Sequence, residues 1–71
     1  MDEYVIVRYQ TARRVFIDGA EVGRTNEPLT VERGTHKIDL GQPANYTPSF
    51  RRVQVADTNL AEPREVSFDK T

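Results

Sequence analysis

The sequence predicts an all-β protein, a small antiparallel β-sandwich of about seven short strands with no helix. Two observations predict this fold class. Short runs of β-branched and aromatic residues are separated by glycine and proline turn signals at close spacing, which is typical of small sandwiches. In addition, each window long enough for a helix is interrupted by glycine, proline or β-branched residues. A partly open barrel is the main architectural alternative.

Length and composition limit what this protein can be. The chain has 71 residues, of which 37% are hydrophobic and 30% charged, and its formal net charge is -1. We expect a single domain over residues 1–71 with a small core, because a domain of this size hides only about 60% of the surface that its unfolded chain exposes. The chain has no cysteine, which excludes disulfides and thiolate chemistry.

The start of the chain is acidic and is followed by only a brief apolar run, unlike a secretory signal. No segment has the length and apolar character of a transmembrane helix. For the chain as given we therefore expect a cytoplasmic protein that does not insert into membranes. If it is excised from a longer protein, the expected location becomes the cell envelope or cell surface.

The first two expected strands cover residues 3–9 and 13–18. Apolar residues occur at both parities of the first run, so we expect it to be central in its sheet or covered on both faces, with Val5 and Val7 inward. The second run alternates and places Val15 and Ile17 on one face. Because the polar connection between the runs is short, we expect the two strands to pair as a hairpin.

Asp18 and Gly19 form a strong turn signal, after which we expect a very short return strand over residues 21–23. The next strand contains Leu29 and Val31. The clearest alternation follows over residues 35–40. It places one set of side chains inward, His36, Ile38 and Leu40, and the other outward, Thr35, Lys37 and Asp39.

Residues 41–49 contain two prolines and no periodicity, so we expect a loop in which Tyr46 is the only large side chain. Strands follow over residues 51–55 and 64–68, separated by a second loop. The expected core consists of Val5, Val7, Val15, Ile17, Leu29, Val31, Ile38, Leu40, Val53, Val55, Val66 and Phe68.

The order of these elements resembles a known family. The residues that carry the resemblance are Val15-Phe16-Ile17-Asp18-Gly19, Val22-Gly23-Arg24-Thr25, Pro28-Leu29, Gly34-Thr35-His36-Lys37-Ile38, Tyr46 and Arg52-Val53-Gln54-Val55. Between Gln10 and Phe68 the chain resembles a PEGA domain. The resemblance implies a small β-sandwich that serves as a non-catalytic accessory module, often in bacterial cell-envelope or surface proteins.

No catalytic, cofactor or metal constellation is evident, so we expect a protein that is not an enzyme and needs no cofactor. His36 is the only histidine, and a metal site normally takes several ligands. We therefore interpret His36 as a residue at the rim of the core. The carboxylates are scattered, without a histidine or second carboxylate at a catalytic spacing.

Two functional hypotheses follow. The first is a structural or protein-interaction module whose partner is another protein or a second copy of the chain, bound at an exposed sheet edge. The second is a nucleic-acid or carbohydrate binder that uses a candidate surface of Tyr46, Phe50, Arg51 and Arg52. The negative net charge argues against nucleic acid. Neighbouring strand residues also point to opposite faces, so Arg51 and Arg52 cannot join one patch.

Overall fold

The computed structural model describes residues 2–71, and these residues form β-strands without any helix. The strands are β1 (Asp2–Arg8), β2 (Arg14–Ile17), β3 (Ala20–Arg24), β4 (Pro28–Glu32), β5 (Gly34–Asp39), β6 (Tyr46–Thr47), β7 (Arg51–Val55), β8 (Arg64–Ser67) and β9 (Asp69–Lys70). The all-β prediction is confirmed. Within these residues there is accordingly no helix able to cross a membrane.

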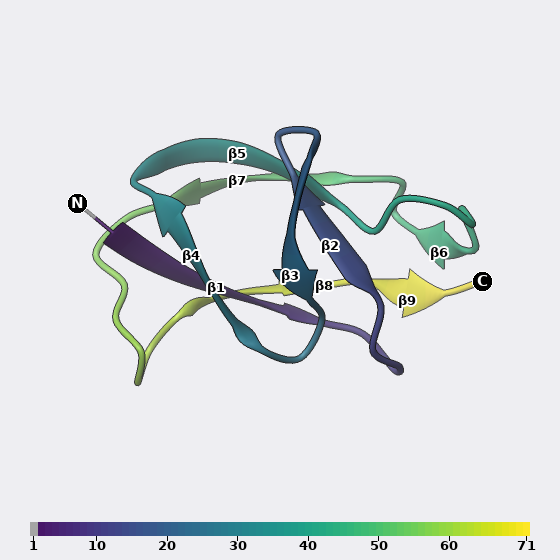
Figure 1. The fold of residues 1–71 in the computed structure, drawn as a ribbon, viewed down its shortest axis with the longest axis horizontal. Coiled ribbons are helices and arrows are strands. Elements are labelled where there is room, and N and C mark those ends of the chain that lie inside the picture. The colour runs from purple at the N-terminus through teal and green to yellow at the C-terminus, as the bar shows by residue number, and fades with distance from the viewer. Residues whose placement is uncertain (1) are drawn as a thin grey trace.

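The strands form a three-stranded sheet, β4-β1-β8, and a four-stranded sheet, β3-β2-β5-β7. The two-residue strands β6 and β9 pair with each other near the C-terminus (Figure 1). All pairings are antiparallel except the one between β1 and β8, which is parallel. The start of β1 and the C-terminus lie at opposite ends of the long axis.

Two expectations about the strands are corrected. The strands expected to form the first hairpin, β1 and β2, belong to different sheets, because the segment between them crosses from one sheet to the other. The expected loop over residues 41–49 also contains β6, which pairs with β9. The expectation that the first strand is central is confirmed, since β1 lies between β4 and β8.

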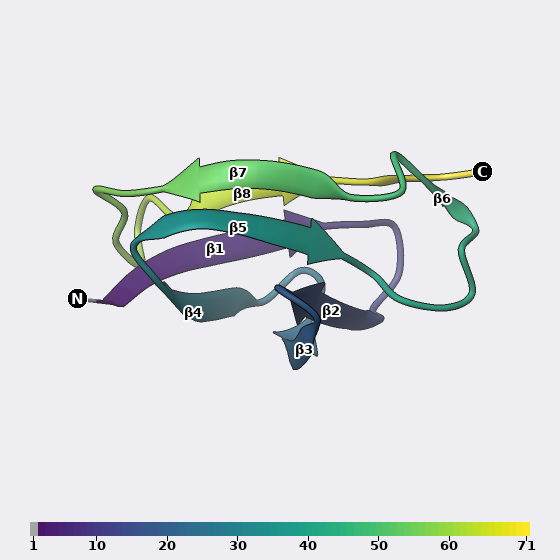
Figure 2. The ribbon, with the colours of Figure 1, turned by 90° about the horizontal axis from the view of Figure 1, so that it is seen from above.

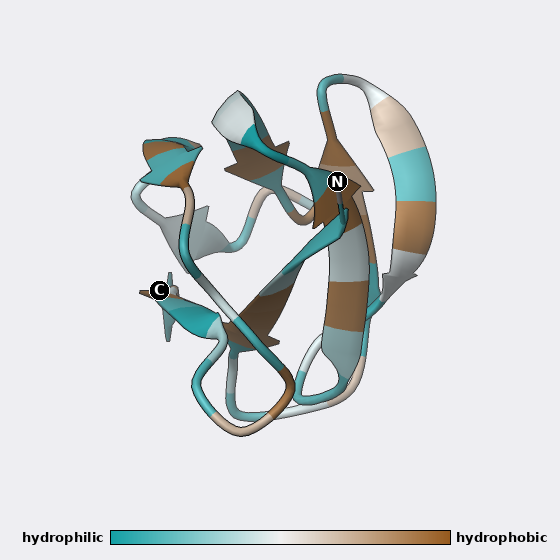
Figure 3. Cartoon of the chain, turned by 90° about the vertical axis from the view of Figure 1, so that its left-hand side faces the viewer, coloured by the Kyte–Doolittle hydropathy of each residue, from teal (hydrophilic) through white to brown (hydrophobic). Residues whose placement is uncertain are grey.

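The core lies between the two larger sheets. Every residue of the expected core is buried, and Val5, Val7, Val15, Ile38 and Val55 are fully buried, whereas His36, also expected on the inward side, is only partly buried. Figure 3 shows hydrophobic residues alternating with hydrophilic ones along the strands, as expected for strands with one buried face. Several residues outside the expected core are also buried, namely Glu3, Ile6, Tyr9, Thr25 and Tyr46.

The β2–β3 hairpin forms as the turn signal predicts. Asp18 and Gly19 both have positive φ, 53° and 86°. Positive φ at both central residues is the requirement of a type I′ turn, whose twist matches that of the flanking strands. The return strand β3 is longer than expected and extends to Arg24.

A buried Thr25 side chain holds the crossover between the two sheets. Its hydroxyl donates to the carbonyl of Thr11 at 2.8 Å and accepts from the backbone N–H of Arg13 at 3.0 Å. The backbone N–H of Thr25 donates to the carbonyl of Arg13 at 2.9 Å. Since Thr25 is only 1% exposed, water cannot easily replace these bonds.

The next residue, Asn26, holds the other end of the same crossover. Its side-chain amide donates to the carbonyl of Tyr9 at 2.9 Å, and its carbonyl oxygen accepts from the N–H of Tyr9 at 3.2 Å. Its backbone N–H donates to the carbonyl of Val7 at 2.7 Å. Asn26 adopts φ 65°, a left-handed conformation that asparagine tolerates better than most residues. We call Thr25 and Asn26 the crossover clamp.

A buried carboxylate fixes the loop before β8. Glu3 is 3% exposed, and its Oε1 accepts from the backbone N–H of Thr58 at 2.8 Å and from the Thr58 hydroxyl at 2.7 Å. These hydrogen bonds, the side-chain one first, lower the pKa of Glu3. The charge is therefore satisfied although it is buried.

The crossover clamp gives a stability prediction. Replacing Thr25 by valine keeps the shape of the side chain but leaves the Arg13 N–H and the Thr11 carbonyl without their partner. We expect the free energy of unfolding to fall by about 1–3 kcal/mol and the Tm by roughly 5–15 °C, measured by thermal and urea unfolding. Thr25→Ser is the matched control, because it loses a methyl group but keeps the hydroxyl. Equal stability of the two variants would contradict this role.

Candidate interaction surface

The four candidate surface residues do not lie together. Tyr46 belongs to the core, where its hydroxyl accepts from the backbone N–H of Leu40 at 3.2 Å. Its ring meets Phe68 edge to face, with centroids 5.5 Å apart. The guanidinium of Arg13 lies 4.9 Å from the centroid of the Tyr46 ring. Tyr46 is therefore not available to stack on a base or a sugar.

The loop around Tyr46 is also fixed to the protein. Arg13 donates to the Asn45 side-chain oxygen at 2.7 Å and to the carbonyls of Leu40 and Pro43 at 3.2 and 2.8 Å. A planar guanidinium with several donors in fixed directions is suited to joining such separate acceptors. The loop is thus a structural part of the fold.

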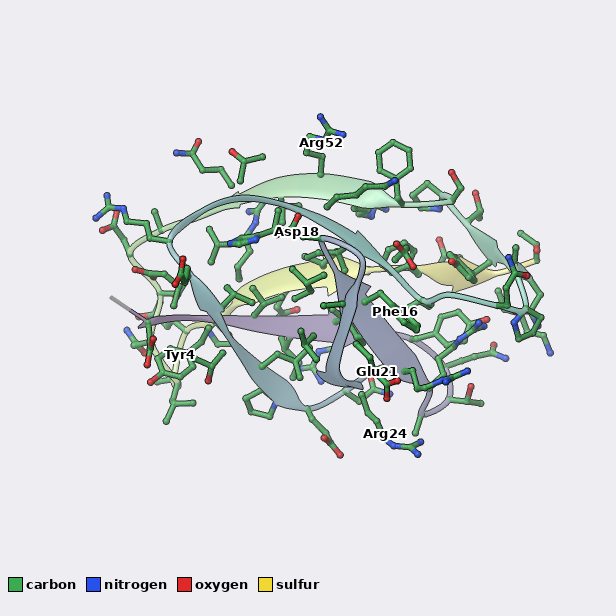
Figure 4. The ribbon with its side chains drawn as sticks, turned by 45° about the horizontal axis from the view of Figure 1, so that its top comes forward. Tyr4, Phe16, Asp18, Glu21, Arg24 and Arg52 are labelled. Atoms are coloured by element: carbon green, nitrogen blue, oxygen red, sulfur yellow. The ribbon has the colours of Figure 1, made fainter. Side chains whose placement is uncertain are left out.

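The other three candidates lie at or beside β7. Phe50 is 42% exposed, and the ammonium of Lys37 lies 4.9 Å from its ring centroid. Arg51 donates from Nε to the carbonyl of Ser67 at 2.7 Å and so joins the two sheets. Arg52 is exposed and is the direct cross-strand partner of Lys37. Figure 4 shows Arg52 projecting away from the ribbon.

The structure therefore assembles Phe50, Arg52 and Lys37 into one surface, which we call the β7 surface. Alternation along residues 35–40 correctly predicts that Lys37 points outward. Its position beside Phe50 and Arg52 depends on the register of β5 against β7. Nothing in the local sequence specifies this register.

The free backbone groups of β7 can be identified from its neighbours. The carbonyl of Lys37 accepts from the N–H of Asp18, and the N–H of Lys37 donates to the Asp18 side chain, so both groups point toward β2. The pair of Lys37 and Arg52 is consequently a non-hydrogen-bonded pair. Because hydrogen-bonded and non-hydrogen-bonded pairs alternate, the N–H and carbonyl groups of Arg52 and Gln54 point away from β5.

Beyond these groups no strand pairs with β7 among residues 2–71. Figure 2 shows β7 at the margin of the molecule. The strand has five residues without proline, glycine or bulge. It is therefore a regular unpaired edge, the type of edge that can pair with another chain.

The other sheet edges are less regular. On β3 the register against β2 shifts between Val15 and Phe16, which leaves Val22 as a bulge. The edge strand β4 begins with Pro28, which has no N–H. Gly23 of β3 also approaches β4 so closely that a Cβ there would lie 2.5 Å from the Leu29 side chain. The fourth edge strand, β8, has only four residues.

Comparison with known protein families gives one match. The family model of the PEGA domain matches residues 4–68. The chain belongs to the PEGA family. The searches of curated proteins and of solved structures found no significant match.

Membership confirms the resemblance read from residues 10–68 and extends it into β1. In this PEGA domain, residues 10–13 form the crossover and contribute the backbone partners of Thr25.

Among residues 2–71, no group of three or more histidine and acidic side chains is arranged to hold a metal ion.

His36 forms an ion pair behind the β2–β3 turn of this PEGA domain. Its Nδ1 lies 2.6 Å from the Asp18 carboxylate, and its Nε2 lies 2.6 Å from the carbonyl of Glu32. Both partners can only accept hydrogen bonds, so both are satisfied only when the imidazole is doubly protonated. The hydrogen bond to Asp18, followed by that to Glu32, raises the pKa of His36 above its ordinary value of 6.5.

The pKa of Asp18 shifts in the opposite direction. The backbone N–H of Lys37, followed by His36, lowers it below its ordinary value of 3.8. Because folding raises the pKa of His36, the protonated imidazole stabilises the fold. This stabilisation is fully present below pH 6.5 and is lost as the pH rises through the folded-state pKa. Because folding lowers the pKa of Asp18, the ionised carboxylate stabilises the fold. This stabilisation is fully present above pH 3.8 and is lost as the pH falls through the folded-state pKa. The pair stabilises the fold most between these two limits.

The ion pair predicts how stability depends on pH. We expect the Tm to fall between about pH 5.5 and about pH 8.5, because His36 loses its second proton over this range. The Tm is measured by calorimetry. His36→Gln removes the titrating group, so its Tm is lower at acidic pH and varies less over this range. If the variant and the wild-type protein show parallel pH profiles, the ion pair does not act as described.

Proposed function

We propose that this PEGA domain is a non-catalytic protein-interaction module that binds an extended segment of a partner protein along the free edge of β7. One observation carries this proposal. The N–H and carbonyl groups of Arg52 and Gln54 point outward from a regular strand, and no other strand pairs with them among residues 2–71. An extended peptide gains main-chain hydrogen bonds when it adds to such an edge.

The position of Arg51 supports this use of the edge. Its side chain anchors the start of β7 to Ser67 in the opposite sheet. Pairing with β5 fixes the inner side of the strand along its whole length. The edge is thus held in its extended conformation before a partner arrives, which reduces the entropic cost of binding.

The charge of the edge favours a different protein over a second copy. If two β7 strands paired antiparallel about Val53, each Arg52 would lie opposite Gln54 of the other copy. The two Arg52 residues would then be diagonal neighbours, about 7–8 Å apart. Like charges at such distances oppose strand pairing. The proposed partner is therefore another protein.

Binding through the β7 edge predicts a difference between two variants at one position. Peptides are first selected from a displayed library of short linear sequences on the wild-type domain. Gln54→Pro removes an outward N–H but no hydrogen bond to β5, so we expect the domain to fold and to bind the selected peptides at least about tenfold more weakly. Binding is followed by fluorescence anisotropy, and folding by circular dichroism.

Gln54→Ala is the matched control, because it removes the same side chain but keeps the N–H. It should bind the selected peptides about as well as the wild-type domain does. Equal binding by the proline and alanine variants would contradict strand addition. A library that yields no binding peptide would contradict the proposed function itself.

A further inference from the structure

The β7 surface carries two positive charges that face each other. Lys37 and Arg52 are direct cross-strand partners in a non-hydrogen-bonded pair. In such pairs the Cα atoms lie only about 4.5 Å apart, so the side chains start close together. Like charges directly opposite each other destabilise a sheet. The pair therefore makes no favourable contribution to the fold by itself.

Neither cation forms an ion pair within the described part of the chain. The ion pairs there join Arg8 with Glu65, Arg14 with Glu21, Arg33 with Asp57 and His36 with Asp18. Asp18 adjoins Lys37 in the sheet, but one of its carboxylate oxygens is bonded to His36 and the other to the backbone N–H of Lys37. Asp18 lies near enough to Arg52 for their charges to attract, but because its oxygens are already bonded, neither cation has a carboxylate of its own next to the free edge.

An exposed apolar group lies beside them. Phe50 precedes Arg52 by two residues, is 42% exposed and has Lys37 near its ring. Residues two apart along a strand direction lie on the same side, about 6.6 Å from one another. Phe50, Arg52 and Gln54 therefore form a row that runs next to the outward N–H and carbonyl groups.

A strand added to β7 would lie about 4.8 Å from it and would place alternate side chains opposite this row. The pairings within the four-stranded sheet are all antiparallel, so we take the added strand as antiparallel too. From these positions we infer that the β7 edge selects an acidic extended segment. Its aspartate or glutamate faces Arg52, and the residue two positions further toward its C-terminus is apolar and faces Phe50. This inference rests on the proposed function, because it names the partner of the same edge.

The test uses the selected peptides and two charge-reversal variants. Arg52→Glu reverses a charge in the β7 surface. Arg24→Glu is the matched control, because Arg24 is an exposed arginine on the opposite edge strand, β3, of the same sheet. Figure 4 shows the two arginines on opposite sides of the molecule. Both substitutions change the net charge equally, and the Tm of each variant is checked first.

If the inference holds, the selected peptides carry an acidic residue followed two positions later by an apolar one. Arg52→Glu weakens their binding about five- to tenfold at low salt, whereas Arg24→Glu changes it less than about twofold. Replacing the peptide's acidic residue by lysine restores binding to Arg52→Glu but not to the wild-type domain.

Two results would overturn the inference while leaving the proposed function intact. One is a set of peptides that depend on the Gln54 N–H but show no acidic preference. The other is an equal loss of binding in both charge-reversal variants. A third result would overturn the inference as well. If a single-stranded oligonucleotide displaces the peptides at the same concentration, the surface recognises negative charge in general.

Discussion

The crossover clamp is the constraint on which the rest of this fold depends. A chain that runs from β1 into β2 through a short polar connection would ordinarily turn back and pair with itself. Here Thr25 and Asn26 bind the backbone on both sides of that connection and direct β2 into the other sheet. Since β1 cannot then pair with β2, it pairs with β4 and β8.

Separation into two sheets creates four edges, and these edges are protected to different degrees. A bulge interrupts β3, β4 begins with a proline, and β8 is short. Arg51 links β7 to the opposite sheet at one end but leaves the outward backbone groups of Arg52 and Gln54 free. The position of the candidate binding edge therefore follows from the same crossover that defines the core.

Much of this fold could be predicted from sequence, because a strand with one buried face repeats every two residues. Alternation was sufficient to identify inward residues such as Val15, Ile38 and Val55 and the exposed side of β5. It could not reveal the clamp, whose side-chain bonds to the crossover join residues 12 to 17 positions apart in the sequence. Tyr46 shows the same limit, since an aromatic residue in a region without periodicity gives no sign of being buried. The meeting of Lys37 with Arg52 required the register between two strands, which only the folded chain specifies.

Amide hydrogen exchange along β7 tests the free edge most directly, because the edge is defined by individual backbone groups. We expect slow exchange for the N–H groups of Arg51, Val53 and Val55, which point toward β5, and fast exchange for those of Arg52 and Gln54. Measurement by NMR on the free domain would show this alternation residue by residue. Uniform protection along the strand, or protection of Arg52 and Gln54 alone, would contradict the free edge and with it the proposed mode of binding.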